Sequence, residues 1–310
     1  RSVQDGIFAL YHYYADLFSV SQKNYLVILL PPSDGTDSSI IGGAGTGSVC
    51  ATFHTNSKRD WELLSHRMFH AYFDSIVRRQ TFHSAPYLWF YEGIATYYEN
   101  RSMGFLPKDV QVSVNLKPEQ EFPSLFNKYL YVRLKDPTLF SFAPMDEKNI
   151  TESQAGGAKI EFLHYVQAPL VVRLMEDISF QQSKQSDSLL KYLLKNKDHP
   201  DQCTYAQILK NLLGKCAEEI YHSYFLSNNI LPLWYLHDDT YSQKQTLTDL
   251  NDIENQLASW MTGLPGKYPT EELNMKTIQK IENRSEFQSV HFSDGQTEQS
   301  VQDFSPVIRY

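Results

Sequence analysis

Two histidines four residues apart are candidate metal ligands. His66 and His70 fall in a segment whose apolar residues recur at helical spacing, in a helix expected to begin near Ser57. On a helix this spacing places both imidazoles on one face, one turn apart, which suits two ligands of one zinc ion. Because the chain has 10 histidines, such a pair also arises by chance. A histidine pair packed beside a core helix is therefore the alternative interpretation of the pair alone.

A carboxylate 22 positions after His70 completes a ligand set. Glu92 lies in the aromatic stretch LWFYEGIATYYEN, which predicts a helix over residues 87–100. A buried carboxylate without a partner is costly, so Glu92 needs one. Two histidines from one helix and a glutamate from the next leave one zinc position open, as in catalytic zinc sites. Thr96, one turn after Glu92, is a candidate hydrogen-bond partner for it. Asp74, one turn after His70, is a candidate to orient that imidazole or is a solvated surface residue.

These segments resemble the gluzincin metallopeptidases. LSHRMFHAYF and LWFYEGIATYYEN are similar to the active-site helix and the glutamate-ligand helix of the aminopeptidase N and glycyl aminopeptidase families. HYVQAPLVVRLMEDI is similar to the helix with the families' Tyr-x-Lys-Gly-Ala motif, which puts Tyr165 at the position of their transition-state tyrosine. The resemblance covers residues 7–232. It implies a zinc cofactor, a peptidase-type active site and a location outside the cytoplasm, and it does not separate the two families.

The sequence departs from the family motif at the residue that performs the chemistry. The motif is His-Glu-x-x-His, whereas this chain reads His66-Arg67-Met68-Phe69-His70. The family's glutamate takes a proton from zinc-bound water, and arginine cannot do so because it stays protonated at any working pH. The positive charge of Arg67 also opposes a metal dication, and an Arg67–Glu92 ion pair is an alternative to metal binding.

A second acid of the aminopeptidases is also missing. Their segment that holds the substrate's amine contains a glutamate, whereas the aligned stretch GGAGT, residues 42–46, has no acid. Its glycines lead into a strand-like segment rather than a helix, so we expect a hairpin or edge-strand loop instead of a dinucleotide-binding turn. Glu62, one turn before His66, lies too far along the helix to replace the missing base.

Several elements must position these residues. Strands are expected over residues 24–31 and 49–53. Further helices are expected over residues 5–20, 156–178, 186–196, 204–213, 216–226, 251–262 and 270–282, and residues 103–155 are expected to be irregular.

This order predicts an α+β fold with three parts. The resemblance makes residues 1–155 a thermolysin-like α/β subdomain with the zinc-motif helices, a small mixed sheet included. Residues 156–232 form a helical subdomain, and residues 233–310 are a C-terminal extension or a small additional module.

Composition excludes two classes of partner. The chain of 310 residues has a net charge of -8 and no block of basic residues, so a nucleic-acid binder is not expected. No apolar run approaches the roughly 20 residues of a membrane-spanning helix. The 3 cysteines do not form a disulfide framework.

Two functions stay open at this point. The first is a metallopeptidase-like domain without hydrolysis, a binding or scaffold module that holds an extended peptide along an edge strand near residues 40–53. The second is an active zinc aminopeptidase in which His66, His70 and Glu92 bind the metal and Tyr165 stabilises the oxyanion. The remaining alternative is a coincidental match in an ordinary helical domain.

Overall fold

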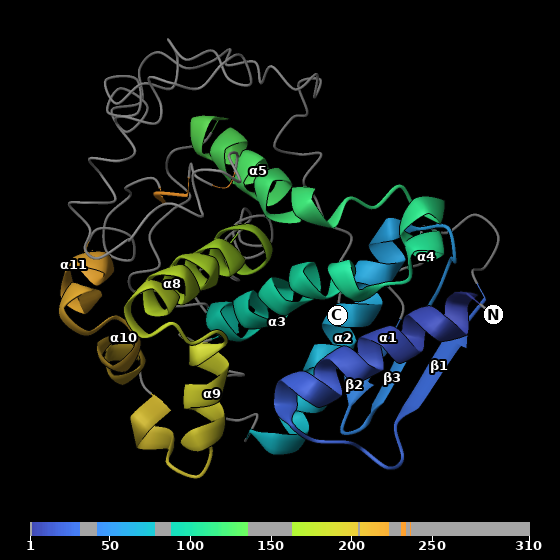
Figure 1. Cartoon of the computed structure of the whole chain (residues 1–310), viewed down its shortest axis with the longest axis horizontal. Helices are drawn as coiled ribbons and strands as arrows, with labels where there is room; N and C mark the ends of the chain where they lie inside the picture. Colours follow the sequence, from blue (N-terminus) through green and yellow to red (C-terminus); the bar gives the residue numbers. More distant parts are fainter. Residues whose placement is uncertain are drawn as a thin grey trace, which may run out of the picture.

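The fold combines many helices with one small sheet, in agreement with the expected α+β class (Figure 1). It is seen in a computed structural model that describes residues 2–31, 42–77, 88–135, 163–203, 205–222, 231–233 and 236. The helices expected over residues 251–262 and 270–282 lie outside these ranges, as does nearly all of the C-terminal module. Within the described ranges, no helix combines the length and the apolar character needed to span a membrane.

The sheet has three strands in the order β1-β3-β2. β1 (Leu26–Leu30) runs parallel to β3 (Ser48–Thr52), and β2 (Gly42–Gly45) runs antiparallel to β3. The expected hairpin or edge-strand loop is thus a regular edge strand joined to β3 by a tight turn. Gly47 adopts φ +68 in that turn, a conformation that side-chain-bearing residues rarely take.

Two helices lie next to each other beside this sheet. α1 (Ser2–Phe18) contacts α2 (Lys58–Ile76), which packs on β2 and β3. The side chain of Ser57 accepts a hydrogen bond from the Asp60 amide at 3.2 Å, which caps α2 where the sequence predicted its start. The Asp60 carboxylate does not complete a reciprocal capping box but accepts from the His54 amide at 2.6 Å.

A buried helix forms the centre of the molecule. α3 (Leu88–Ser102) contacts α2 on one side, and on the other it contacts α8 (Ala168–Ser183) and the π-helical turn η5 (Leu163–Gln167). Gly93 permits the close approach to α8, since a Cβ placed there would lie 2.5 Å from the Ala168 Cβ. The glycine that follows the candidate ligand Glu92 is therefore a packing requirement.

The expectation of an irregular segment over residues 103–155 is wrong for much of its length. This region contains η3 (Met103–Phe105), α4 (Lys108–Ser113), η4 (Pro118–Gln120) and α5 (Glu121–Lys135). Pro107 stands at the N-cap of α4 and Pro118 at the first position of η4. Prolines at these positions start helices rather than break them, because the first amides of a helix lack intrahelical partners. Residues 136–155 lie outside the described ranges.

The remaining helices follow the prediction more closely. They are α9 (Ser188–Lys195), η6 (Pro200–Cys203), α10 (Tyr205–Leu213), η7 (Gly214–Cys216) and α11 (Ala217–Ile220). α10 contacts α8, α9 and α11, so these helices form one packed block next to α3.

Candidate metal centre

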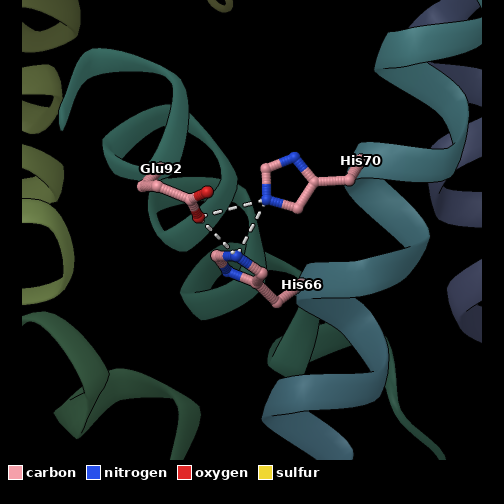
Figure 2. Close-up of side chains that lie close together, drawn as sticks. All are labelled: His66, His70 and Glu92. Atoms are coloured by element: carbon pink, nitrogen blue, oxygen red, sulfur yellow. Dashed lines mark hydrogen bonds and ion pairs between the residues drawn. The ribbon is translucent and has the colours of Figure 1, made fainter. Parts of the chain in front are cut away.

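The two histidines and Glu92 meet in one buried cluster (Figure 2). The Nε2 atoms of His66 and His70 lie 2.9 Å apart. Glu92 Oε2 lies 3.0 Å from His66 Nε2 and 3.2 Å from His70 Nε2. The three side chains therefore point one potential ligand atom each at a common position, as the sequence spacing predicted.

Packing between the two helices produces this convergence. The four-residue spacing puts His66 and His70 on the face of α2 that meets α3. Between them on the chain, Phe69 stacks on Tyr98 of α3, with ring centroids 5.4 Å apart and planes 11° apart. This buried aromatic contact fixes how closely α2 and α3 approach, so the ligand atoms are held by the core rather than by a loop.

The donor set fits a zinc ion. Two neutral imidazole nitrogens and one carboxylate oxygen form a known catalytic zinc set with bonds of about 2.0–2.2 Å, which places ligand atoms roughly 3.3 Å apart around a tetrahedral ion. The separations of 2.9 to 3.2 Å are close to that value. Without an ion, the same contacts are hydrogen bonds from a protonated His66 to Glu92 and Glu99, so zinc binding would displace the proton on His66 Nε2.

Glu99 is a site residue that the sequence analysis missed. Its Oε2 lies 3.0 Å from His66 Nδ1, and its side chain is buried. A carboxylate only accepts, so it holds the hydrogen of His66 on Nδ1 and directs Nε2 toward the cluster. The sequence spacing could have indicated it, because Glu99 follows Glu92 by seven residues, two turns along the same face of α3.

His70 is held differently. Its Nδ1 atom is buried and has no hydrogen-bond partner within the described part of the chain. The Tyr91 ring packs against its imidazole with centroids 4.3 Å apart, and the Tyr91 hydroxyl donates to Asp74 at 2.8 Å. Of the two interpretations of Asp74, neither a direct hydrogen bond to the candidate ligand His70 nor a purely solvated residue is seen among the residues that the structure describes, because Asp74 accepts from the tyrosine that packs on His70.

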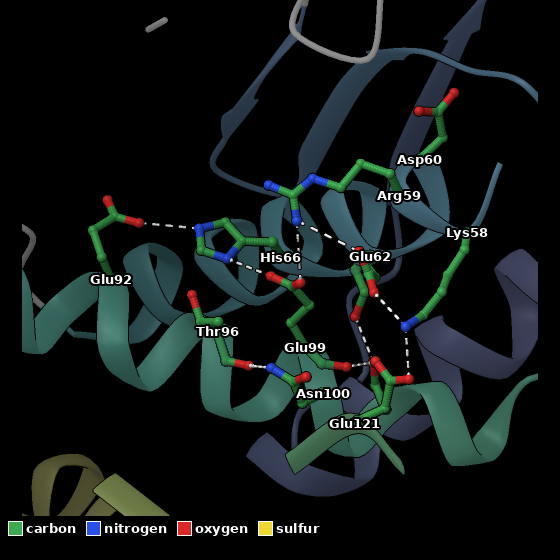
Figure 3. Close-up of polar contacts among 12 residues, drawn as sticks. Lys58, Arg59, Asp60, Glu62, His66, Glu92, Thr96, Glu99, Asn100 and Glu121 are labelled. Atoms are coloured by element: carbon green, nitrogen blue, oxygen red, sulfur yellow. Dashed lines mark hydrogen bonds and ion pairs between the residues drawn. The ribbon is translucent and has the colours of Figure 1, made fainter. Parts of the chain in front are cut away.

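The expected hydrogen bond from Thr96 to Glu92 is absent. Thr96 Oγ1 is buried and has no hydrogen-bond partner among the described residues. The Thr96 carbonyl instead accepts from Asn100 at 2.7 Å (Figure 3). The reason is geometric, since the Glu92 carboxylate turns toward the two imidazoles of α2 and away from its own next turn.

The pKa values of the two histidines shift in opposite directions. Burial disfavours the charged form of His66, but hydrogen bonds and charges from Glu92 and Glu99 outweigh it and raise its pKa to about 9. Burial and the neighbouring His66 lower the pKa of His70. Burial alone would raise the pKa of Glu92, but His70 and His66 hold that pKa well below its usual range. Glu92 is thus an ionised ligand at neutral pH.

Arg67 turns toward the sheet. Its Nη1 lies 3.5 Å from the carbonyl oxygen of Cys50 on β3, and it also lies beside Gly42 of β2. Within the described residues no ion pair joins Arg67 to Glu92, whose Oε2 faces both imidazoles. The hypothesis that Arg67 replaces the metal by pairing with Glu92 is therefore wrong. The side chain is long enough to carry its charge away from the cluster.

Tyr165 lies beside the cluster although it is about a hundred residues away in sequence. It belongs to η5, and its ring centroid lies 5.8 Å from that of His66. π-Helical turns inside helices often mark functional sites. This one brings an aromatic hydroxyl-bearing residue to the side of the candidate ligands.

Comparison with known proteins adds no relatives. No protein family model, no curated protein and no solved structure matches this chain.

Proposed function

We propose that this chain is a zinc-binding, metallopeptidase-like domain that has lost hydrolysis and binds extended peptides. His66, His70 and Glu92 would hold the metal, and Glu99 would orient His66. The observation that carries the proposal is the buried convergence of three ligand atoms from two helices. The thermolysin-like arrangement of the subdomain is part of the same proposal, and the helix order around the cluster supports it.

The chain's own residues define what the site can do. When bound, zinc would supply Lewis-acid polarisation of a ligand carbonyl. Glu92 and the Nε2 atoms of both histidines would face it, and Tyr165 stands at the side of the cluster, where its hydroxyl is a candidate donor to a ligand oxygen.

Hydrolysis requires a general base, and this site has none at the family position. Arg67 occupies that position and extends to the Cys50 carbonyl. Loss of general-base catalysis typically slows a reaction about 10²- to 10⁴-fold. We therefore infer that a peptide is bound at this site without being cut at enzymatic rates.

The edge strand β2 supports peptide binding. It lies at one edge of the three-stranded sheet, and Gly42, Gly43 and Gly45 are exposed. Glycines leave the backbone amides and carbonyls of this edge unobstructed, which favours the addition of a peptide strand. Because β2 contacts α2, such a peptide would run past the helix that carries the histidines.

Metal analysis of the full chain tests the metal site. We expect about one zinc per chain after incubation with zinc and removal of excess, as for one three-ligand site. His66→Ala should lose this zinc, whereas the exposed His12→Ala should keep it. A wild-type chain without zinc, or equal zinc in both variants, would contradict the proposal.

The position of Tyr165 also favours the second function, an active zinc peptidase. A peptidase assay with zinc on the wild-type chain and on Arg67→Glu separates the two. Our proposal predicts that the wild-type chain turns over at least about 10²-fold more slowly than the Arg67→Glu variant, the typical effect of a missing general base. Turnover by the wild-type chain at ordinary enzyme rates would establish the second function instead.

A further inference from the structure

A network of charged side chains lies behind His66, on the side away from Glu92 (Figure 3). It joins three helices: Lys58, Arg59 and Glu62 come from α2, Glu99 from α3 and Glu121 from α5. Lys58 Nζ lies 3.2 Å from Glu62 and 2.8 Å from Glu121. The network thus contains three carboxylates and two cations, and it ends at the imidazole of a candidate metal ligand.

Glu99 is held from both ends of its carboxylate. Oε2 faces His66 Nδ1 at 3.0 Å, and Oε1 lies 3.8 Å from Arg59 Nη1. The same Arg59 nitrogen lies 3.5 Å from Glu62. Arg59 is therefore the cation of this network that contacts Glu99 directly, whereas Lys58 contacts the other two carboxylates.

The helix spacing explains why Arg59 reaches this position. Arg59 and His66 are seven residues apart on α2, two turns along one face, and Glu99 of α3 lies opposite both. The side chain of Arg59 is 47% exposed, whereas that of Glu99 is 7% exposed. A surface cation thus reaches inward to a buried carboxylate.

The positive charge of Arg59 compensates the negative charge of the buried Glu99 carboxylate. An ionised carboxylate buried near two others is unfavourable unless cations compensate it. Without Arg59, no guanidinium would lie beside Oε1 of Glu99. The Glu99 carboxylate would then be freer to rotate away from His66. The outer partners of metal-bound histidines set ring orientation and metal affinity.

We propose that Arg59 is a positioning residue of the metal site, which fixes the Glu99 carboxylate that orients His66. The inference rests on the proposed metal binding. The competing explanation is that Arg59 makes an ordinary surface ion pair with Glu62, which contributes little to stability and nothing to the metal.

Cobalt titration of the full chain separates these explanations, because Co²⁺ in a tetrahedral site absorbs visible light in a way that reports the ligand geometry. The variants are Arg59→Gln, Arg59→Lys and the matched control Lys58→Gln, which removes the neighbouring cation of the network that does not contact Glu99. Thermal unfolding of each metal-free variant measures any loss of folding.

We expect Arg59→Gln to weaken Co²⁺ affinity about 3- to 10-fold, less than direct loss of an outer partner because Arg59 acts through Glu99 and is half exposed. Its visible Co²⁺ spectrum should change. Arg59→Lys should recover part of the affinity, and Lys58→Gln should leave affinity and spectrum unchanged even if its unfolding temperature falls.

Two results would overturn the inference while the metal site stands. One is an Arg59→Gln variant with wild-type affinity and spectrum, and the other is an equal loss of affinity in Lys58→Gln. A wild-type chain that binds neither Co²⁺ nor Zn²⁺ would overturn the metal site and this inference together.

Discussion

At the scale of single residues, His66 has more hydrogen-bond partners in the candidate site than His70 does. Both of its ring nitrogens have carboxylate partners, Glu99 at Nδ1 and Glu92 at Nε2. His70 has an aromatic neighbour, Tyr91, and its Nδ1 has no hydrogen-bond partner among the described residues. The orientation of His66 is therefore fixed by hydrogen bonding, whereas that of His70 is fixed by packing.

This difference predicts the effect of Glu99→Gln. The amide keeps the shape of the side chain but removes the charge that fixes the hydrogen on His66 Nδ1. Zinc affinity should fall about 10- to 100-fold, the usual effect of losing such a partner. Competition with a chromophoric chelator measures this, and the exposed Glu119→Gln serves as control. Unchanged zinc affinity would mean that the His66–Glu99 contact does not serve the metal.

At the scale of elements, the site depends on where α3 lies. α3 is fixed on one side by α2 through Phe69 and Tyr98, and on the other by α8 through Gly93 and Ala168. Because Glu92 precedes Gly93 directly, any shift of α3 away from α8 moves the candidate ligand. The α2–α3 contact thus sets the distance between Glu92 and the histidines, and α8 holds α3 in place from the other side.

We predict that Gly93→Ala destabilises the chain by about 1–3 kcal/mol, the usual cost of overpacking a core. The new Cβ would meet the Ala168 Cβ at 2.5 Å. The double variant Gly93→Ala with Ala168→Gly removes that clash and should recover much of the stability. Urea denaturation measures each variant.

Gly104→Ala is the matched control for this test. A Cβ at Gly104 would lie 3.7 Å from Pro118, an ordinary contact, so its effect should be small. If Gly93→Ala were as stable as Gly104→Ala, or if the double variant gained nothing, α3 would not be held against α8 as described.

At the scale of the whole molecule, the charged network joins α2 and α3, the helices of the candidate metal site, to α5. Its third carboxylate, Glu121, is buried against Lys58. Burial, with the nearby charges of Glu62 and Glu99, raises the pKa of Glu121 to about 7 against the opposing effect of Lys58. The folded chain therefore keeps this proton at pH values where the unfolded chain has lost it.

The sign of the resulting pH dependence follows from linkage. Between the ordinary pKa of 4.5 and about 7, the folded state binds more protons than the unfolded state, so Glu121 makes stability fall as pH rises. We predict that Glu121→Gln gains stability relative to the wild-type chain between pH 5 and pH 8. Urea denaturation at both values measures this, with Glu119→Gln as control. A constant difference between Glu121→Gln and wild type would contradict it.

The sequence predicted the three candidate ligands better than their surroundings. His66, His70 and Glu92 were found because helical periodicity and the aromatic context of α3 determine which faces meet. Thr96 was assigned to Glu92 because sequence spacing gives a position along a helix but not the direction of a carboxylate. Glu99 and Arg59 were missed for a related reason, since each acts across the contact between α2 and α3.

The fold was predictable where patterns are strong. α2 has an apolar stripe, whereas α3 is apolar and aromatic on most of its faces, and both were expected close to their observed bounds. α4 and α5 were not, because prolines suggested interruption, whereas Pro107 caps α4 and Pro118 begins η4 directly before α5. β2 has no side chain larger than a methyl group, so hydrophobic alternation cannot reveal it; pairing with β3 creates the strand.

Zinc K-edge absorption of the full chain loaded with zinc is the most direct test of the central claim. We predict one shell of nitrogen and oxygen ligands at about 2.0–2.2 Å, with the outer scattering of two imidazoles. Sulfur ligands at about 2.3 Å, or a shell without imidazole, would place the metal elsewhere and contradict the account.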